Sequence, residues 1–223
     1  MTFIGKLLFL ITVSATLAAS ANAQATLPDD EDTQIWGDVQ VTIPVHKKID
    51  LLALSQLRIG ENMSRVNEIR AGGGVTFKPN NRFSIGQGYI YIETRNLLGM
   101  FRTEHRYTTR ATYKFPLKKI GLNHRSLFEY RVRNNIKGWR YRPSLTFEVD
   151  MPEKLIGKAK LFITEEPFYV STTRKFSRNR ISLGISKPLS SRLTLELYYL
   201  RQNDGYSRPG DLNVLGTSWK INL

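Results

Sequence analysis

Apolar and polar residues alternate along most of this chain with a period of two, the pattern of β-strands that have two unlike faces. The alternation is clear in residues 35–43, 51–59, 128–132, 181–185 and 193–197. One phase is apolar and nearly free of charge, whereas the other carries many Arg and Glu side chains. The sequence therefore predicts an all-β protein whose strands each present one apolar face and one charged face.

The phase of each strand assigns its residues to one of these faces. In the segment around residue 91, Ile90 and Ile92 are assigned to the apolar face. The residues assigned to the charged face are Glu68, Arg70, Glu93, Glu104, Arg106, Arg110, Arg125, Glu129, Arg131, Arg133, Arg140, Arg142, Glu148, Asp150 and Glu196. This face carries far more charge than the core of a soluble protein accepts.

Prolines punctuate the alternating segments at a nearly constant spacing of 35 to 37 residues. They are Pro44, Pro79, Pro116, Pro152 and Pro188. An apolar residue or a strand end precedes each proline and polar residues follow it, which favours a tight turn. Less regular breakers lie between them, at residues 60–62, 95–99, 134–138, 172–175 and 203–210. Each unit of about 36 residues is therefore interpreted as a β-hairpin; a solenoid has a similar period but would repeat a residue signature, which this chain does not.

Two architectures fit this pattern. In a soluble sandwich or lipocalin-like barrel the apolar face points inward, whereas in an outer-membrane barrel it faces lipid and the charges line the lumen. Long strands of 12 to 15 residues, short proline turns that alternate with longer loops, and an alternating C-terminal segment, residues 215–223, favour the membrane barrel. Aromatic residues near expected strand ends suit an interfacial girdle: Tyr107, Tyr113, Phe115, Tyr141 and Tyr199.

The fold class predicted is an antiparallel transmembrane β-barrel of 10–12 strands with short proline-containing periplasmic turns. The proline units account for ten strands and residues 34–43 for another. Twelve strands are favoured, because bacterial single-chain barrels have even numbers and the first strand needs a partner. Pro143 falls inside an expected strand, where it removes a ladder donor and predicts a bulge or a strand end.

Composition, charge and the N-terminal residues indicate the cellular location. The chain has 223 residues, a formal net charge of +14 and no Cys, so it has no disulfide, thiolate metal site or lipoprotein anchor. Residues 1–23 have the features of a signal peptide, with Lys6, an apolar stretch at 7–17 and the small residues Ala21 and Ala23. An uncleaved anchor is the alternative, but the apolar stretch is too short to span roughly 30 Å of hydrocarbon.

The expected organisation is therefore a signal peptide (1–23), an acidic N-terminal segment (24–33) and a β-barrel domain (34–223). The expected location is the cell outer membrane of a Gram-negative bacterium, with the periplasm as the alternative. An exported protein rarely meets nucleic acid, so the excess positive charge is not interpreted as a nucleic-acid site. The expected partners are outer-membrane lipid, including lipopolysaccharide, and the barrel-assembly machinery during biogenesis; the oligomeric state is left open.

Several short motifs resemble a known family. They are Glu104-x-Arg106, Arg125-x3-Glu129-Tyr130-Arg131-x-Arg133, Trp139-Arg140-Tyr141-Arg142, Glu165-Glu166-Pro167-Phe168, Asn179-Arg180-x3-Gly184 and Glu196-Leu197-Tyr198-Tyr199. Their order is similar to that of the bacterial family called domain of unknown function 2490, over most of the chain that follows the leader. The resemblance implies an exported, β-barrel-like protein of Gram-negative bacteria and supplies no catalytic residue.

The charged face is the candidate functional site. The proposed lumen cluster consists of Glu104, Arg106, Arg110, Arg125, Glu129, Arg131, Arg133, Arg140, Arg142 and Glu148. These residues either form an internal salt-bridge lattice that fills a narrow lumen, or line a basic channel that attracts anions. The acidic run 29–32 either enters that lumen as a plug or is a solvated leader. Basic residues that could meet lipopolysaccharide phosphates are Arg95, Arg102, Lys137, Arg174, Lys175, Arg178 and Arg208.

Function is expected to be structural, or passive passage of small solutes or anions. The alternatives are a periplasmic ligand-binding barrel and a lipid-modifying enzyme. For an enzyme, the candidate groups are the three His residues, the glycine run 72–74 and the pair Glu165 and Glu166. No nucleophile elbow and no His spacing for a metal occur, so no catalytic, cofactor-binding or metal residue is assigned and no cofactor is expected.

Overall fold

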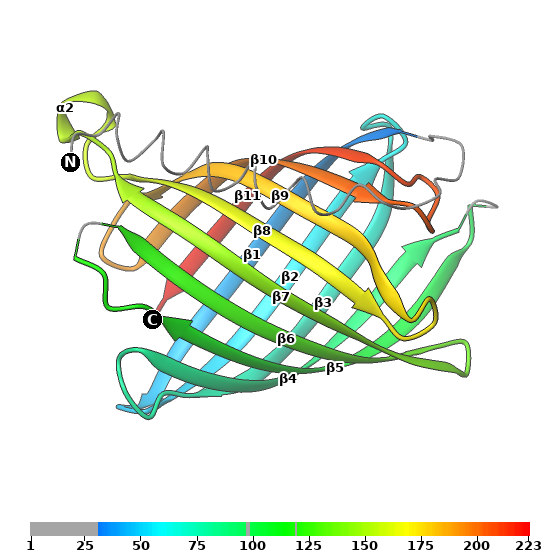
Figure 1. Cartoon of the computed structure of the whole chain (residues 1–223), viewed down its shortest axis with the longest axis horizontal. Helices are drawn as coiled ribbons and strands as arrows, with labels where there is room; N and C mark the ends of the chain where they lie inside the picture. Colours follow the sequence, from blue (N-terminus) through cyan, green and yellow to red (C-terminus); the bar gives the residue numbers. More distant parts are fainter. Residues whose placement is uncertain (1–30, 97–98, 119) are drawn as a thin grey trace.

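The computed structural model describes residues 31–96, 99–118 and 120–223 (Figure 1). The described chain forms eleven β-strands and one short helix. The strands are β1 (Asp32–His46), β2 (Ile49–Gly60), β3 (Arg65–Phe77), β4 (Phe83–Arg95), β5 (Phe101–Lys114), β6 (Gly121–Arg133), β7 (Ile136–Asp150), β8 (Lys160–Val170), β9 (Lys175–Pro188), β10 (Leu193–Asp204) and β11 (Leu212–Asn222). The expected signal peptide and residues 24–30 lie outside the described residues, and β1 begins at Asp32, inside the expected acidic segment.

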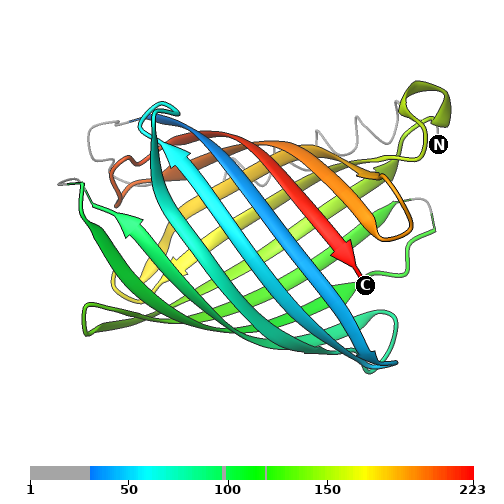
Figure 2. The same cartoon turned by 180° about the vertical axis from the view of Figure 1, so that it is seen from behind.

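The strands form one closed barrel in which each strand pairs with its sequence neighbours in an antiparallel way. The barrel closes between β1 and β11, which pair in parallel from Asp32 opposite Leu212 to Thr42 opposite Asn222. Figure 2 shows these two strands side by side. With an odd number of strands, the first and last strands of a meander run in the same direction. The expectation of twelve strands is therefore wrong, and the closure does not need a twelfth strand because β1 finds its partner in β11.

The connections gather at two ends of the barrel. The proline end, on the left in Figure 1, carries the turns 47–48, 78–82, 115–120 and 189–192 and the connection 151–159, which contains α2 (Glu153–Ile156). The loop end carries the connections 61–64, 96–100, 134–135, 171–174 and 205–211. All five periodic prolines lie at or near the proline end. No helix among the described residues has the length and apolar character needed to cross a membrane.

The expected alternation of short proline turns with longer loops is wrong. The longest connection, 151–159, lies at the proline end, and a two-residue turn, Asn134–Asn135, lies at the loop end. Both asparagines have a positive φ, 47° and 64°, the backbone region that tight hairpin turns need and that Asn tolerates. Turn residues that mark a break in the sequence thus do not reveal how many residues the connection contains.

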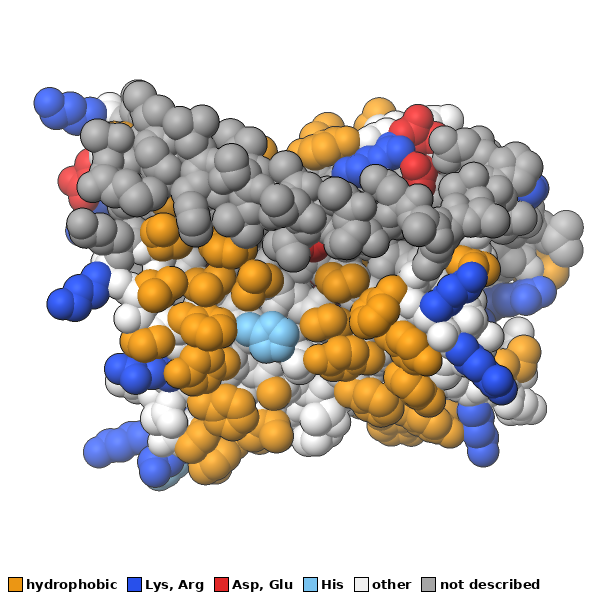
Figure 3. Space-filling view, viewed as in Figure 1, with side chains coloured by type: hydrophobic (Ala, Val, Ile, Leu, Met, Phe, Trp, Pro, Cys, Tyr) orange, Lys and Arg blue, Asp and Glu red, His pale blue; other side chains and the backbone are white. Residues whose placement is uncertain are grey.

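Large apolar side chains cover the outside of the barrel. The exposed ones include Ile35, Val39, Leu51, Leu57, Ile69, Val75, Tyr107, Phe128, Tyr130, Trp139, Phe176, Leu183, Leu197, Leu215 and Trp219. Figure 3 shows a broad apolar band over the middle of the visible wall, with Lys and Arg side chains gathered toward its two ends. Buried charged side chains include Arg70, Glu104, Arg106, Glu129, Arg140, Glu166 and Arg180. The molecule is therefore apolar outside and charged inside.

The face assignment from the sequence is wrong in β4. Ile92 is fully buried and Ile90 lines the lumen, whereas Tyr89 and Tyr91 are exposed on the outer surface. Glu93 shares the outer phase and accepts a hydrogen bond from the Tyr91 hydroxyl. Both faces of this strand carry large apolar residues, Ile90 and Ile92 on one and Tyr89 and Tyr91 on the other. The alternation therefore could not decide which face points into the lumen.

The bulge or strand end predicted at Pro143 is absent, because β7 continues through this residue and its pairing shows no register shift. Pro143 pairs with Ser126 of β6, but the ladder between β7 and β8 has no residue pairs between Tyr141 opposite Tyr169 and Leu145 opposite Glu165. Pro167 lies on the other side of the same gap. Two prolines that each lack an N–H donor therefore share one break in the ladder.

Candidate functional site in the barrel lumen

Glu104 is the centre of the first ion cluster in the lumen. Its carboxylate is bound by the Nη2 atoms of Arg106 at 2.6 Å, Arg131 at 2.8 Å and Arg133 at 2.6 Å. The register of β5 and β6 explains the contact, because Glu104 lies opposite Arg133 and Arg106 opposite Arg131. The Glu104 side chain is only 1% exposed, so its charge depends on these guanidinium groups rather than on water.

Glu129 is the second buried carboxylate. It binds Arg140 Nη2 at 2.6 Å, Arg142 Nη1 at 2.9 Å and Arg106 Nη1 at 3.3 Å. Arg106 thus bridges Glu104 and Glu129. Arg142 in turn binds Glu166 at 2.6 Å, so one connected lattice runs from β5 to β8.

Two further groups of ion pairs extend the lattice around the wall. Arg58 of β2 and Arg70 of β3 bind Glu68 Oε1 at 3.0 and 2.5 Å. Arg178 of β9 donates a hydrogen bond from Nε to Asp204 Oδ2 at 2.6 Å.

Two buried aromatic rings join these groups. Phe168 is fully buried, and the guanidinium carbons of Arg140, Arg142, Arg178 and Arg180 lie 4.4 to 5.5 Å from its ring centre. Trp36 lies between Arg58, at 3.7 Å, and Arg180, at 4.9 Å. Cation–π contacts of this kind are worth most when water is excluded, as it is here.

We call this assembly the charged network. It consists of Trp36, Arg58, Glu68, Arg70, Glu104, Arg106, Glu129, Arg131, Arg133, Arg140, Arg142, Glu166, Phe168, Arg178, Arg180 and Asp204. It occupies the half of the lumen toward the loop end, and its arginines outnumber its carboxylates. The contact of Trp36 in β1 with Arg180 in β9 joins strands that are not adjacent in the sheet.

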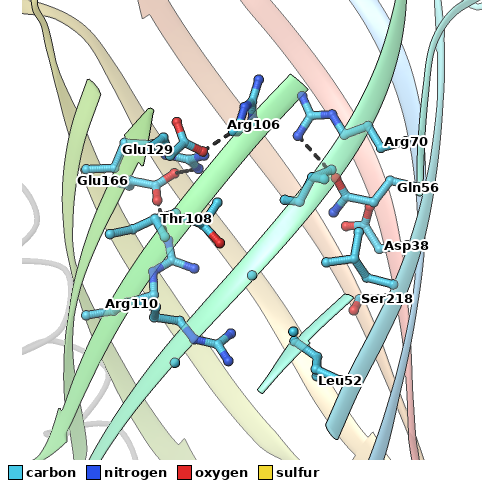
Figure 4. Close-up of a pocket in the computed structure, with 18 of the residues that line it drawn as sticks. Asp38, Leu52, Gln56, Arg70, Arg106, Thr108, Arg110, Glu129, Glu166 and Ser218 are labelled. Atoms are coloured by element: carbon cyan, nitrogen blue, oxygen red, sulfur yellow. Dashed lines mark hydrogen bonds and ion pairs between the residues drawn. The ribbon is translucent and has the colours of Figure 1, made fainter. Parts of the chain in front are cut away.

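A cavity of about 350 Å³ extends from the charged network toward the proline end (Figure 4). Its lining includes Leu52, Leu54, Thr76, Arg110, Arg125 and Phe162. Arg110 donates a hydrogen bond from Nη2 to Thr76 Oγ1 at 3.2 Å. Within the described part of the chain, no carboxylate lies within ion-pair distance of Arg110. The cavity therefore contains a cation that no acidic side chain of the described residues neutralises.

Nine of the ten residues proposed for the lumen cluster lie in the network or the cavity. Glu148 does not: its carboxylate binds Lys160 at 3.3 Å near the proline end. The sequence grouped Arg178 with the residues that could meet lipopolysaccharide phosphates, but its side chain binds Asp204 and lies beside Phe168 in the lumen. The sequence also missed Trp36, Arg58 and Phe168. Phe168 lies two residues after Glu166 and therefore on the same face of β8. This spacing is the sequence signal that could have placed Phe168 in the lumen.

The groups considered for catalysis lie apart. Glu165 and Glu166 fall on opposite faces of β8, since Glu165 accepts a hydrogen bond from Asn179 whereas Glu166 binds Arg142. His105 is exposed on the outer surface and stacks with Tyr89. In the described residues, no group of three or more His, Asp or Glu side chains could hold a metal ion.

The described part of the acidic run lies at the loop end. Asp32 accepts hydrogen bonds from the backbone N–H groups of Glu61 and Asn62. Glu31 accepts a hydrogen bond from the Arg201 guanidinium, which lowers the pKa of this exposed carboxyl below its usual value. Asp29 and Asp30 lie outside the described residues, so the plug and leader hypotheses for them stay predictions.

Comparisons with known proteins agree with the expected family. The family model described as "Protein of unknown function (DUF2490)" matches residues 33–213, which confirms the resemblance. An uncharacterised protein of Methylorubrum extorquens is 26% identical over 201 residues, covering 86% of this chain and 87% of that protein. An anion-selective porin from Comamonas acidovorans aligns with a TM-score of 0.36 and 15% identity, over 76% of this chain and 55% of the porin chain.

Proposed function

This chain belongs to the DUF2490 family of proteins of unknown function, and from its faces and lumen we propose that it is an outer-membrane β-barrel that the charged network keeps closed at rest. In this proposal its main role is structural. The observation that carries the proposal is the inversion of the faces, with large apolar side chains outside and buried ion pairs inside.

The exposed apolar surface supports a lipid environment. Burying apolar area is worth about 25 cal/mol per Å², so an apolar band around the whole barrel would be costly in water. The strands have 11 to 15 residues, and about 9–11 tilted residues are enough to cross a bilayer. A row of contacting rings on the outer surface, from Phe128 through Trp139 and Tyr169 to Phe176, suits the aromatic interface of such a barrel.

The protein is proposed to reach the outer membrane by export and to contact lipopolysaccharide there. Residues 1–23 act as a cleaved signal peptide, and the barrel-assembly machinery of a Gram-negative cell inserts the chain into the outer membrane. Basic residues at the loop end, such as Arg95, Arg102 and Arg174, then contact lipopolysaccharide phosphates. The proposal assigns the barrel no catalytic step, no cofactor and no metal.

Cell fractionation tests the location. We expect the protein in the outer-membrane fraction, with a gel mobility that changes on heating, because a closed barrel resists detergent until it is heated. The matched reference is a known soluble periplasmic protein in the same preparation. Release of the chain with that reference, together with a mobility independent of heating, would contradict the proposal.

Passive passage of small anions is the second candidate function. The excess of arginine over carboxylate in the lumen favours it, because a basic lining attracts anions. The fully buried Phe168 ring fills the centre of four guanidinium groups and supports the closed state.

Planar-bilayer recording separates the two candidates. We expect the wild-type protein to show no steady conductance. We expect Phe168→Ala to produce anion-selective openings, because it empties the centre of the network, and Phe128→Ala, which removes an outward ring, to stay silent. Steady anion-selective current through the wild-type barrel would replace the closed state with the anion pore as the function.

A further inference from the structure

We propose that the cavity between the charged network and the proline end is a binding site for a small amphipathic carboxylate. Arg110 and Arg125 hold the carboxylate head, and Leu52, Leu54 and Leu127 cover the apolar body. This inference goes beyond the proposed function, because it concerns what the lumen holds and depends on neither the membrane nor the closed state.

Arg110 supplies the main reason. Its only hydrogen bond to a described side chain is the one from Nη2 to the Thr76 hydroxyl. A guanidinium group has five N–H donors in a planar fork, which matches the two oxygens of a carboxylate. Figure 4 shows Arg110 apart from the ion pairs, with its guanidinium directed into the space between the walls. The unused donors of this cation therefore point to an anionic acceptor.

Arg125 adds a second donor on the same wall. One of its Nη atoms binds Glu166, but its Nε is buried and has no partner among the described residues. In the register of β5 and β6, Arg110 lies opposite Leu127 and Thr112 lies opposite Arg125. Arg110 and Arg125 are therefore diagonal neighbours on the lumen face, within reach of one bound anion. Glu166 binds both Arg125 and Arg142, so its single negative charge is shared between two guanidinium groups.

Glycines let two threonine hydroxyls pack closely against the cavity wall near Arg110. A Cβ atom on Gly86 would lie 3.6 Å from Arg110 Nη2 and 3.1 Å from Thr76 Oγ1, and one on Gly88 would lie 2.9 Å from Thr108 Oγ1. A side chain at either position would displace the neighbouring hydroxyl, so Gly86 and Gly88 keep Thr76 and Thr108 in place beside the cavity. The hydroxyls of Thr76 and Thr108 are in turn hydrogen-bond donors for an anion.

Part of the lining is apolar and can cover an apolar body, although polar and charged side chains line the rest of the cavity. Leu52 and Leu54 come from β2, Leu127 comes from β6 and Phe162 comes from β8. A cavity of about 350 Å³ is at the lower end of the usual range for small-molecule sites, roughly 300–1,000 Å³. An inorganic anion would leave these apolar side chains uncovered, so a head with an apolar chain fits the lining better.

Lysines at the proline end would attract such an anion. Those in or next to the proline-end connections are Lys47, Lys48, Lys78, Lys114, Lys118, Lys154, Lys158, Lys160, Lys187 and Lys220. Three of them bind carboxylates: Lys78 binds Asp50, Lys160 binds Glu148 and Lys220 binds Glu196. The remaining positive charge raises the local concentration of anions near the cavity.

Titration with octanoate tests the inference. The full-length protein, purified in neutral maltoside micelles, is titrated calorimetrically with octanoate, with octanol as the neutral analogue and with inorganic phosphate as the head without a chain. The variants are Arg110→Gln in the cavity and Arg82→Gln, an exposed arginine in the turn at the same end. Each variant is first checked for the wild-type gel mobility before and after heating.

The expected result is saturable octanoate binding that falls at least about tenfold in Arg110→Gln and changes less than about twofold in Arg82→Gln, with weaker binding of octanol and phosphate. If Arg110→Gln does not fold, Leu54→Gln replaces it and is expected to weaken octanoate binding without a change in charge. No saturable binding, equal loss in both arginine variants, or phosphate or octanol binding as tight as octanoate would overturn the inference.

Discussion

Glu104 shows how single residues specify the interior of this barrel. Removing a carboxylate from water costs several kcal/mol, and here three guanidinium groups offset that cost at 2.6 to 2.8 Å. The same arginines would repel one another without it. The carboxylate is therefore required by its neighbours as much as it requires them.

Neutralising Glu104 should destabilise the barrel. We expect Glu104→Gln to lower the free energy of unfolding by about 3 kcal/mol, because it leaves buried guanidinium charges without a counter-charge. Urea unfolding in detergent micelles, followed by tryptophan fluorescence, measures the change. The matched control is Glu148→Gln, which removes a carboxylate that is 28% exposed and should cost less than about 1 kcal/mol. Equal effects of the two substitutions would refute the dependence on burial.

The period-two pattern predicts which residues of β5 to β7 share the lumen face, but not which of them meet. Arg131 and Arg133 reach Glu104 because the strands pair in one register, and Glu148 lies on the same face yet joins Lys160 instead. The period cannot give the position of a residue along the barrel axis relative to another strand. That position depends on strand register, which long-range pairing sets.

At the scale of elements, the parallel seam between β1 and β11 is the feature that the sequence did not predict. Counting turns gives ten or eleven strands, and the rule of even numbers then favours a twelfth. The chain instead closes with eleven, and the start of β1 and the end of β11 lie at opposite ends of the barrel. The odd number of strands therefore places the first residue of β1 and the last residue of β11 at opposite ends of the barrel.

A disulfide across the seam tests this closure. Gly37 lies opposite Thr217, and the space around the Gly37 Cα is open, so Gly37→Cys combined with Thr217→Cys should form a cross-link on mild oxidation. The chain has no Cys of its own, which makes the reaction specific. A non-reducing gel and peptide mapping detect it.

The matched control moves one cysteine four residues along the same strand. Gly37→Cys with Asn213→Cys separates the two sulfurs by about 13 Å along the strand direction and should give no cross-link. Cross-linking of both pairs, or of neither, would speak against the parallel register.

At the scale of the whole molecule, the two ends of the barrel differ in charge. Most of the described lysines lie at the proline end, whereas most arginines lie in the lumen or at the loop end. Connection length does not distinguish the ends, so it gives no orientation. The proposal places the proline end in the periplasm, together with the C-terminal end of β11.

Labelling of surface cysteines tests this orientation. Thr172→Cys places a thiol in an exposed turn at the loop end, and Ser191→Cys places one in an exposed turn at the proline end. On intact cells a membrane-impermeant maleimide should label the first and not the second, and both should react after permeabilisation. The reverse pattern would place the proline end outside.

The sequence by itself determined the all-β class, the two faces of most strands, the family and the grouping of the periodic prolines. These properties depend on local periodicity and turn chemistry, which are present in any short stretch of chain. Only the tertiary structure decided the eleven-strand closure, the inward phase of β4, the placement of Phe168 among four arginines and the position of Arg110, which has no acidic partner among the described residues. Each of these depends on register and on contacts between strands far apart in the chain, which no local pattern contains.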